Sequence, residues 1–340
     1  MMKTSRRLLT SAALLAAASL ALAGCASSST DSSSTPAADG TGSVVDTMYG
    51  EVTVPAASDD LKVVALGWSD AEMALALGVV PVAVYDWQAF GAENKGVGPW
   101  ATELFGDTTP EIIENAGDAL NFEQIQALDP DLILNTRAAD DEKVYDRLSE
   151  IAPTVYAPEG TPAFATAWDV QLEQVGAALG KADEATTLVD DTTTQIADAA
   201  AEHPEFEGLT TVAATKFGDA YGAYLAGDGR FDILADLGFV QNPSVLELEP
   251  AGFYANVSAE QISDFDADVT VLLPIGFTAD EMLADPLLQS LAVVKDGRAI
   301  ALDPADELTG AYSAASVLSI PVVLDGLVPQ LAEAAAKVAK

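Results

Sequence analysis

Short apolar runs alternate with helical patterns over most of the chain, and this alternation predicts an α/β fold with a mostly parallel sheet. Residues 62–66 (Lys-Val-Val-Ala-Leu) form a buried-strand run, and residues 71–77 follow as a helix that Ser69 or Asp70 caps and Gly78 ends. The same order continues with strands predicted over residues 82–85, 132–134 and 154–156 and helices over residues 122–128 and 144–151.

The middle of the chain interrupts this order with helical sequence. Residues 163–179 are predicted to be helical. After Gly180, residues 182–202 contain no Gly or Pro and keep their apolar positions mostly at helical spacing, until His203-Pro204 ends the helix. A second α/β block follows, with strands predicted over residues 210–214, 269–273 and 299–302 and helices over residues 231–237 and 321–339.

The first residues have the layout of a secretory signal. Lys3, Arg6 and Arg7 precede an apolar run over residues 8–22, which is shorter than the roughly 20 residues that a membrane-spanning helix needs. The run ends in Leu-Ala-Gly-Cys, which resembles a bacterial lipobox, so we predict cleavage after residue 24 and lipid attachment at Cys25. General secretion and the twin-arginine route both remain open as export pathways.

The chain therefore divides into five predicted parts. A signal peptide (residues 1–24) precedes a tether (residues 25–45) that is rich in Ser, Thr, Ala, Asp and Gly and is expected to be disordered. The remaining parts are an N-terminal α/β block over residues 46–180, a linking helix over residues 181–204 and a C-terminal α/β block over residues 205–340.

The composition excludes several classes of partner and site. Cys25 is the only cysteine, which excludes an intrachain disulfide and a cysteine-rich metal site. Three of the 15 bases and none of the 53 acids precede it, so the mature chain keeps 12 bases and a formal net charge of −41. Nucleic acid is therefore an implausible partner, and a basic groove for a phosphate-rich ligand is disfavoured.

One motif suggests an enzyme. Gly67-Trp68-Ser69-Asp70-Ala71 lies between a predicted strand and helix, as does the exposed serine of α/β-hydrolases. Such a serine needs a histidine base. The only histidine is His203, at the end of the long helix, and a lone histidine also argues against a zinc site and histidine-ligated haem. Hydrolysis by Ser69 is therefore a distant alternative.

Five sequence features together resemble the substrate-binding lipoproteins of iron-siderophore and cobalamin ABC importers, a class III periplasmic-binding-protein family. Each is weak alone, but they occur in this order over nearly all of the mature chain. They are Leu66-Gly67-Trp68-Ser69-Asp70, residues 121–125 (Asn-Phe-Glu-Gln-Ile) followed by 128–133 (Leu-Asp-Pro-Asp-Leu-Ile), the long helix, Gly229-Arg230-Phe231 leading to Leu237-Gly238, and residues 257–262 (Val-Ser-Ala-Glu-Gln-Ile).

The resemblance implies two Rossmann-like lobes joined by a single long α-helix, with a ligand cleft between them and no enzymatic activity. It implies a lipid-anchored monomer on the outer face of the cytoplasmic membrane, which hands a ferric siderophore to an ABC importer permease. The iron would be carried within the siderophore, so no cofactor or direct metal site is expected. By motif, Glu123 and Glu260 would each engage permease arginines, although an acid at a helix start can also simply favour the helix dipole.

The carboxyl ends of the predicted strands should line the cleft. Aromatic side chains there would cover an apolar chelate, and cations would bind its oxygens. The candidates are Trp68, Tyr85, Trp87, Arg137, Lys216, Tyr221, Arg230, Phe277 and Tyr312. Core packing and surface ion pairs are the alternatives for these aromatic and basic residues. The acidic chain favours a neutral or cationic ferric hydroxamate, while cobalamin, haem or another metal chelate remain open.

Overall fold

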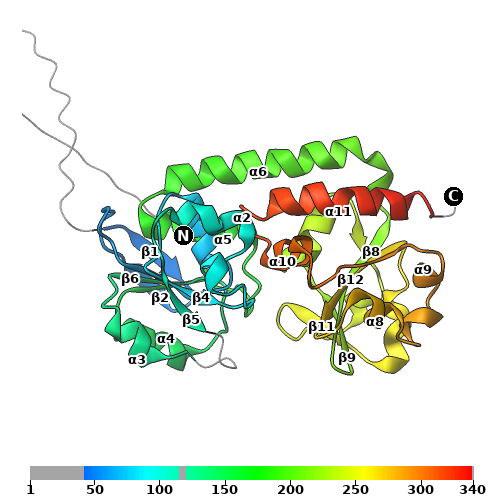
Figure 1. Cartoon of the computed structure of the whole chain (residues 1–340), viewed down its shortest axis with the longest axis horizontal. Helices are drawn as coiled ribbons and strands as arrows, with labels where there is room; N and C mark the ends of the chain where they lie inside the picture. The colour runs from blue at the N-terminus through cyan, green and yellow to red at the C-terminus, as the bar shows by residue number, and fades with distance from the viewer. Residues whose placement is uncertain (1–41, 115–119, 339–340) are drawn as a thin grey trace, which may run out of the picture. The chain divides into compact units, whose positions relative to one another are not determined.

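The computed structural model describes residues 42–114 and 120–338. Within these residues the chain forms two α/β lobes, and a long helix runs across both of them (Figure 1). The signal peptide, Cys25 and most of the tether lie outside the described residues. The described part contains no helix that is both long and apolar enough to cross a bilayer.

The N-terminal lobe is built on a five-stranded parallel sheet. Its strand order is β5-β4-β3-β6-β7. The central strands β3 and β6 are buried along their whole length, which is why residues 63–65 and 132–134 read as apolar runs. The strands are β3 (Val63–Ala65), β4 (Ala83–Asp86), β5 (Glu111–Glu114), β6 (Leu132–Asn135) and β7 (Thr154–Tyr156).

Helices cover both faces of this sheet. On β6, Leu132 and Leu134 pack toward α1 (Asp70–Ala76) and α5 (Trp168–Leu179). Ile133 points the other way, toward α3 (Phe122–Ala127) and α4 (Glu142–Ser149). The short helix α2 (Pro99–Thr102) follows β4. Helix α5 begins five residues later than predicted, because residues 163–167 form a loop.

An antiparallel hairpin that was not predicted precedes this lobe. It consists of β1 (Val44–Thr47) and β2 (Gly50–Thr53). Val45 and Val52 are buried in the same core as α5, so the hairpin is an integral part of the lobe. Its first two residues lie within the range that was expected to be tether.

The C-terminal lobe has a mixed six-stranded sheet with the path β11-β9-β8-β12-β13, and β10 pairs with β8. The pairs β8–β12, β12–β13 and β8–β10 are parallel, whereas β8–β9 and β9–β11 are antiparallel. The strands are β8 (Thr210–Phe217), β9 (Ala220–Tyr224), β10 (Val240–Gln241), β11 (Tyr254–Val257), β12 (Val269–Ile275) and β13 (Ala299–Ala301).

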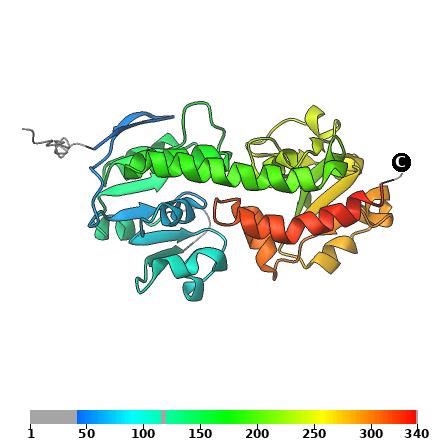
Figure 2. The same cartoon turned by 90° about the horizontal axis from the view of Figure 1, so that it is seen from above.

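Five α-helices accompany the described part of this sheet. Helices α7, α10 and α11 pack in the core shared with α5 and α6, and α11 runs beside α6 (Figure 2). The prediction of an α/β fold with two lobes is confirmed. The helices are α7 (Gly229–Asp236), α8 (Ala279–Leu283), α9 (Ala292–Lys295), α10 (Glu307–Ala314) and α11 (Ile320–Ala335).

Two segments connect the lobes. The first is α6 (Ala182–Glu202), whose 21 residues span about 30 Å (Figure 1). The second is the turn between α10 and α11, residues 314–319, which we call the α10–α11 corner. The carbonyl of Ala314 accepts hydrogen bonds from Ser69 Oγ (2.9 Å) and Arg137 Nη1 (2.9 Å) of the N-terminal lobe, and Ser316 donates to buried Glu72.

Candidate ligand-binding cleft

A cavity of about 700 Å³ lies between the lobes, which is within the usual range for small-molecule sites. The N-terminal lobe contributes the loops that follow β3 and β4, with Trp68 and Trp87. The C-terminal lobe contributes Arg230 from α7, the end of β12 and residues 304–313 around the start of α10. As predicted for parallel sheets, the cavity lies at the carboxyl ends of strands.

An aromatic cluster crosses from one lobe to the other in this cleft. The ring of Trp68 stacks on Trp87 (centroids 4.5 Å apart, planes at 10°) and lies 4.4 Å from the ring of Phe164. Its edge meets Phe253 of the C-terminal lobe at 5.7 Å, and Phe253 stacks on Tyr224 at 6.2 Å. Rings from both lobes therefore form a continuous apolar wall.

The loop that carries Trp68 is fixed by buried hydrogen bonds. Both carboxylate oxygens of Asp70 are satisfied: they accept from the backbone N–H groups of Gly67 (3.0 Å) and Thr136 (2.9 Å) and from Gln171 Nε2 (2.7 Å). The Gln171 amide also donates to the carbonyl of Trp68. A Cβ at Gly67 would lie 2.3 Å from Asp70 Oδ2, so glycine is required there. Trp68 is therefore presented on a rigid turn.

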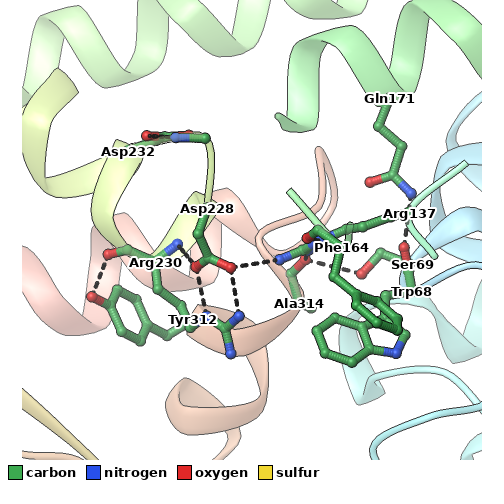
Figure 3. Close-up of polar contacts among 11 residues, drawn as sticks. Trp68, Ser69, Arg137, Phe164, Gln171, Asp228, Arg230, Asp232, Tyr312 and Ala314 are labelled. Carbon is green, nitrogen blue, oxygen red and sulfur yellow. Dashed lines mark hydrogen bonds and ion pairs between the residues drawn. The ribbon is translucent and has the colours of Figure 1, made fainter. Parts of the chain in front are cut away.

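Beneath the cleft, the buried carboxylate of Asp228 binds two guanidinium groups (Figure 3). Asp228 pairs in two places with Arg230 (Nε–Oδ1 2.7 Å, Nη2–Oδ2 2.5 Å) and across the lobes with Arg137 (Nη2–Oδ2 3.5 Å). We call these three side chains the cleft floor, of which Arg230 lines the cavity itself. Although burial opposes ionisation, Arg230 and Arg137 hold the pKa of Asp228 below its usual range. Two cations and one anion leave this floor with one net positive charge.

Aromatic rings also orient Arg230. Its guanidinium lies 3.8 Å from the ring centroid of Tyr224 and 5.3 Å from that of Phe253, within cation–π range. Planar hydrogen-bond donors next to aromatic faces suit an oxygen-rich chelate that has an apolar exterior.

Comparison with known proteins identifies the family. Residues 63–305 match the periplasmic binding protein family. The chain belongs to this family. Its members are transport-binding proteins and not enzymes, so the prediction that the chain is not an enzyme is confirmed.

Individual members of the family resemble this chain over most of its length. A probable siderophore-binding lipoprotein, YfiY of Bacillus subtilis, is 29% identical over 288 residues, covering 77% of this chain and 80% of the relative. A periplasmic solute binding protein from Mycobacterium smegmatis is 32% identical (TM-score 0.74; 87% of this chain, 99% of the other). PiaA of Streptococcus pneumoniae in complex with ferrichrome is 26% identical, with the same TM-score and coverage.

The binding protein's cleft contains three of the predicted site residues, Trp68, Trp87 and Arg230. Tyr85 and Arg137 line an adjoining pocket of about 490 Å³ in the N-terminal lobe, which shares Trp68 with the cleft. Arg137 is 2% exposed, and its other bonds go to backbone carbonyls of Phe164 (3.2 Å) and Ala314 (2.9 Å). In this structure Arg137 acts as a bridge between the lobes.

Three predicted residues gather away from the cleft lining. Lys216 forms an ion pair with Asp285, whose carboxylate also accepts from the Tyr221 hydroxyl (2.6 Å). The ammonium group of Lys216 lies 5.0 Å from the ring centroid of Phe277. These side chains satisfy one another behind the end of β8, although Tyr221 borders a small hollow that joins the cleft.

The prediction that Tyr312 contacts the ligand is wrong for this structure. Tyr312 is completely buried, and its hydroxyl donates to the carbonyl of Arg230. Tyr312 extends from α10 into the hydrophobic core, and its hydroxyl group contacts the backbone of α7 (Figure 3). Sequence reasoning in turn missed Phe164, Phe253 and Asp228.

The geometry around Ser69 does not support nucleophilic catalysis. Ser69 has the positive φ (63°) of a sharp strand-to-helix turn, but its hydroxyl is buried and donates to the Ala314 carbonyl. His203 is at the far end of α6, where it pairs with Glu205 (2.9 Å) and stacks on Phe206. Ser69 therefore has no base, and its turn serves to hold the lobes together.

Glu123 and Glu260 occupy equivalent places in the two lobes. Glu123 is exposed in the first turn of α3, which precedes β6. Glu260 is exposed in the first turn of a 3₁₀ helix (Ala259–Phe265) that precedes β12. Each carboxylate thus stands at the surface of its own lobe. Among the described residues, no cluster of three or more histidine, cysteine or carboxylate side chains is arranged to hold a metal ion.

Proposed function

We propose that this periplasmic binding protein captures a ferric siderophore and delivers it to an ABC importer. The observation that carries the proposal is the cleft, where a wall of rings from both lobes meets the guanidinium group of Arg230 at the floor. Rings cover the apolar exterior of a chelate, and guanidinium groups donate to its iron-bound oxygens. The similarity to a probable siderophore-binding lipoprotein and to a ferrichrome complex supports the same function.

We further propose that the siderophore is a neutral or cationic ferric hydroxamate. The floor contributes one net positive charge, but Asp306 and Glu307 lie exposed at the rim of the same cleft. The mature chain as a whole carries −41. A ferric tris-catecholate carries three negative charges and would meet repulsion from this field. The neutral oxygens of a hydroxamate complex can bind the floor without that cost.

Tryptophan fluorescence tests the ligand class. Titration with ferrioxamine B or ferrichrome should quench the emission saturably at micromolar or lower concentration, because Trp68 and Trp87 line the cleft. Trp68→Phe should remove most of the quenching, whereas Trp168→Phe on α5 should not. Saturable binding of cobalamin or haem, with none of a ferric hydroxamate or catecholate, would overturn the proposal. Binding of a tris-catecholate alone would overturn only the hydroxamate assignment.

We propose that Glu123 and Glu260 bind arginines of the permease, and that a lipid on Cys25 anchors the protein outside the cytoplasmic membrane. Their equivalent, exposed positions on the two lobes support docking at two points. The double variant Glu123→Gln, Glu260→Gln should bind ferric chelate normally but support little iron uptake in cells. The matched pair Glu142→Gln, Glu333→Gln controls for lost surface charge. Weakened chelate binding, or normal uptake, in the docking variant would contradict this role.

A further inference from the structure

A small apolar hollow in the C-terminal lobe adjoins the cleft. This hollow has a volume of about 200 Å³ and lies over the strands β8, β9 and β11. It shares three of its lining residues with the cleft, namely Tyr224, Phe253 and Ile275. The cleft and the hollow therefore meet at these three side chains.

Two exposed apolar side chains form the outer edge of the hollow. Phe217 is 67% exposed and Ile275 is 39% exposed. They are partners in the parallel register of β8 and β12, so they stand side by side at the carboxyl ends of the two central strands. Exposed apolar surface beside a cavity is typical of a ligand groove.

A glycine forms the floor of the hollow. Gly222 on β9 pairs with Asn256 of β11, in the interior of the sheet. A Cβ at this position would lie 3.2 Å from the Tyr254 ring and 3.4 Å from Thr215 Cγ2, so an added side chain would press against two residues that line the hollow. Glycine inside a strand weakens the strand and often marks the close approach of a ligand.

We propose that this acyl groove, lined by Phe217, Gly222, Tyr254 and Ile275, binds an aliphatic chain attached to the ferric hydroxamate. The inference rests on the proposed function and narrows its substrate class to chelates that carry an apolar arm. The hollow is small and apolar and adjoins the cleft, which suits a flexible chain of a few methylenes. A protein partner would instead need a broad surface, because stable interfaces bury about 800 Å² per partner.

A homologous series of ligands tests the groove. N-acetyl, N-butanoyl and N-hexanoyl derivatives of ferrioxamine B are all neutral and differ only in chain length. Each methylene that enters the groove should lower Kd about two- to threefold, because burial of one methylene from water is worth about fourfold when complete. The total gain from acetyl to hexanoyl should be at least about tenfold, measured by fluorescence titration below the micelle concentration.

Three variants test whether the dependence of Kd on chain length arises in the acyl groove. Phe217→Ser and Gly222→Ala should each flatten the dependence on chain length while leaving the N-acetyl derivative bound as in the wild type. Leu246→Ser is the matched control, because Leu246 is 69% exposed on the same lobe but borders neither the cleft nor the hollow. This control should retain the full dependence. Thermal unfolding of each variant checks that the sheet has formed.

The outcomes separate the inference from the proposed function. Equal Kd values across the series in the wild type would overturn the proposal that the groove binds an aliphatic chain. They would leave the proposed capture of a ferric hydroxamate intact. A dependence that survives Phe217→Ser, together with lost uptake in cells, would assign Phe217 to a permease contact and also overturn it. If no ferric hydroxamate binds at all, the proposed function fails and the groove fails with it.

Discussion

Two aspartates on α7, one turn apart, lie in opposite electrostatic surroundings. Asp228 lies buried in the cleft floor, where Arg230 and Arg137 outweigh the penalty of burial and lower its pKa. Asp232 faces the back of the molecule, in a pocket between α5, α6 and α7 that also contains Asp169 and Asp236. Burial, followed by the neighbouring carboxylates, raises the pKa of Asp232 to about 7. One helix thus presents a charged floor to the ligand and a proton-binding group to the linking helix.

The difference shows that burial alone does not decide the ionisation of a carboxylate. Both side chains accept backbone N–H groups near the start of α7, since Asp228 bonds Arg230 N (3.0 Å) and Asp232 bonds Gly227 N (2.9 Å). They differ in the guanidinium groups placed beside Asp228. Those groups come from separate lobes, so the assembly of the lobes creates the charge of the cleft floor.

Replacing the charge of Asp228 should have the largest effect. Asp228→Asn keeps the side-chain shape but leaves two buried guanidinium groups without an anion, which should lower the free energy of unfolding by about 3–5 kcal/mol at pH 8. Urea unfolding measures this loss. Ala197→Gly on the exposed face of α6 is the control, because it should cost only about 1 kcal/mol. A loss for Asp228→Asn no larger than that of the control would contradict the role of the floor.

The equivalent substitution at Asp232 should change the free energy of unfolding in the opposite direction and by a smaller amount. Because folding raises the pKa of Asp232, the folded state favours the protonated form of this side chain. Its ionisation therefore destabilises the folded state as the pH rises from about 4 to about 7. Asp232→Asn removes that ionisation and should increase the free energy of unfolding by about 2–4 kcal/mol at pH 8. Near pH 4 the variant and the wild type should be equally stable.

Urea unfolding at a series of pH values checks this pair of expectations. The gain for Asp232→Asn should develop between pH 4 and pH 7 and then stay constant. A gain that is independent of pH, or a loss at pH 8, would mean that Asp232 is ionised in the folded protein and that its surroundings are not those described. The contrast with Asp228→Asn would then disappear.

Much of the fold was predictable because its central strands are buried on both faces. Strand β3 and residues 132–134 of β6 are apolar at every position, and α6 contains neither glycine nor proline. The hairpin β8–β9 was missed, although the Gly218-Asp219 pair between Phe217 and Ala220 is a recognisable two-residue turn. The hairpin β1–β2 was missed because its four-residue strands adjoin low-complexity sequence.

The site was predictable only where residues follow a strand directly. Trp68, Trp87 and Arg230 satisfy that condition or begin a helix at the same edge. Phe164 lies in a loop with positive φ (59°), where the sequence suggested a helix. Asp228 was not singled out in the sequence, because its partner Arg137 is 91 positions earlier in the chain. Tyr312 was misassigned because α10 was not recognised, although its apolar spacing with Leu308, Ala311 and Ala315 is helical.

The α10–α11 corner also constrains the order in which the molecule can assemble. Its hydrogen bonds join residues 245 positions apart (Ser69 and Ala314) and 244 positions apart (Glu72 and Ser316). A chain emerging from a ribosome or a translocation channel presents the first partner of each pair long before the second. Until then the Glu72 carboxylate lacks the hydrogen bond that Ser316 donates. The N-terminal lobe therefore cannot complete its buried hydrogen bonds until nearly the last residues of the chain arrive.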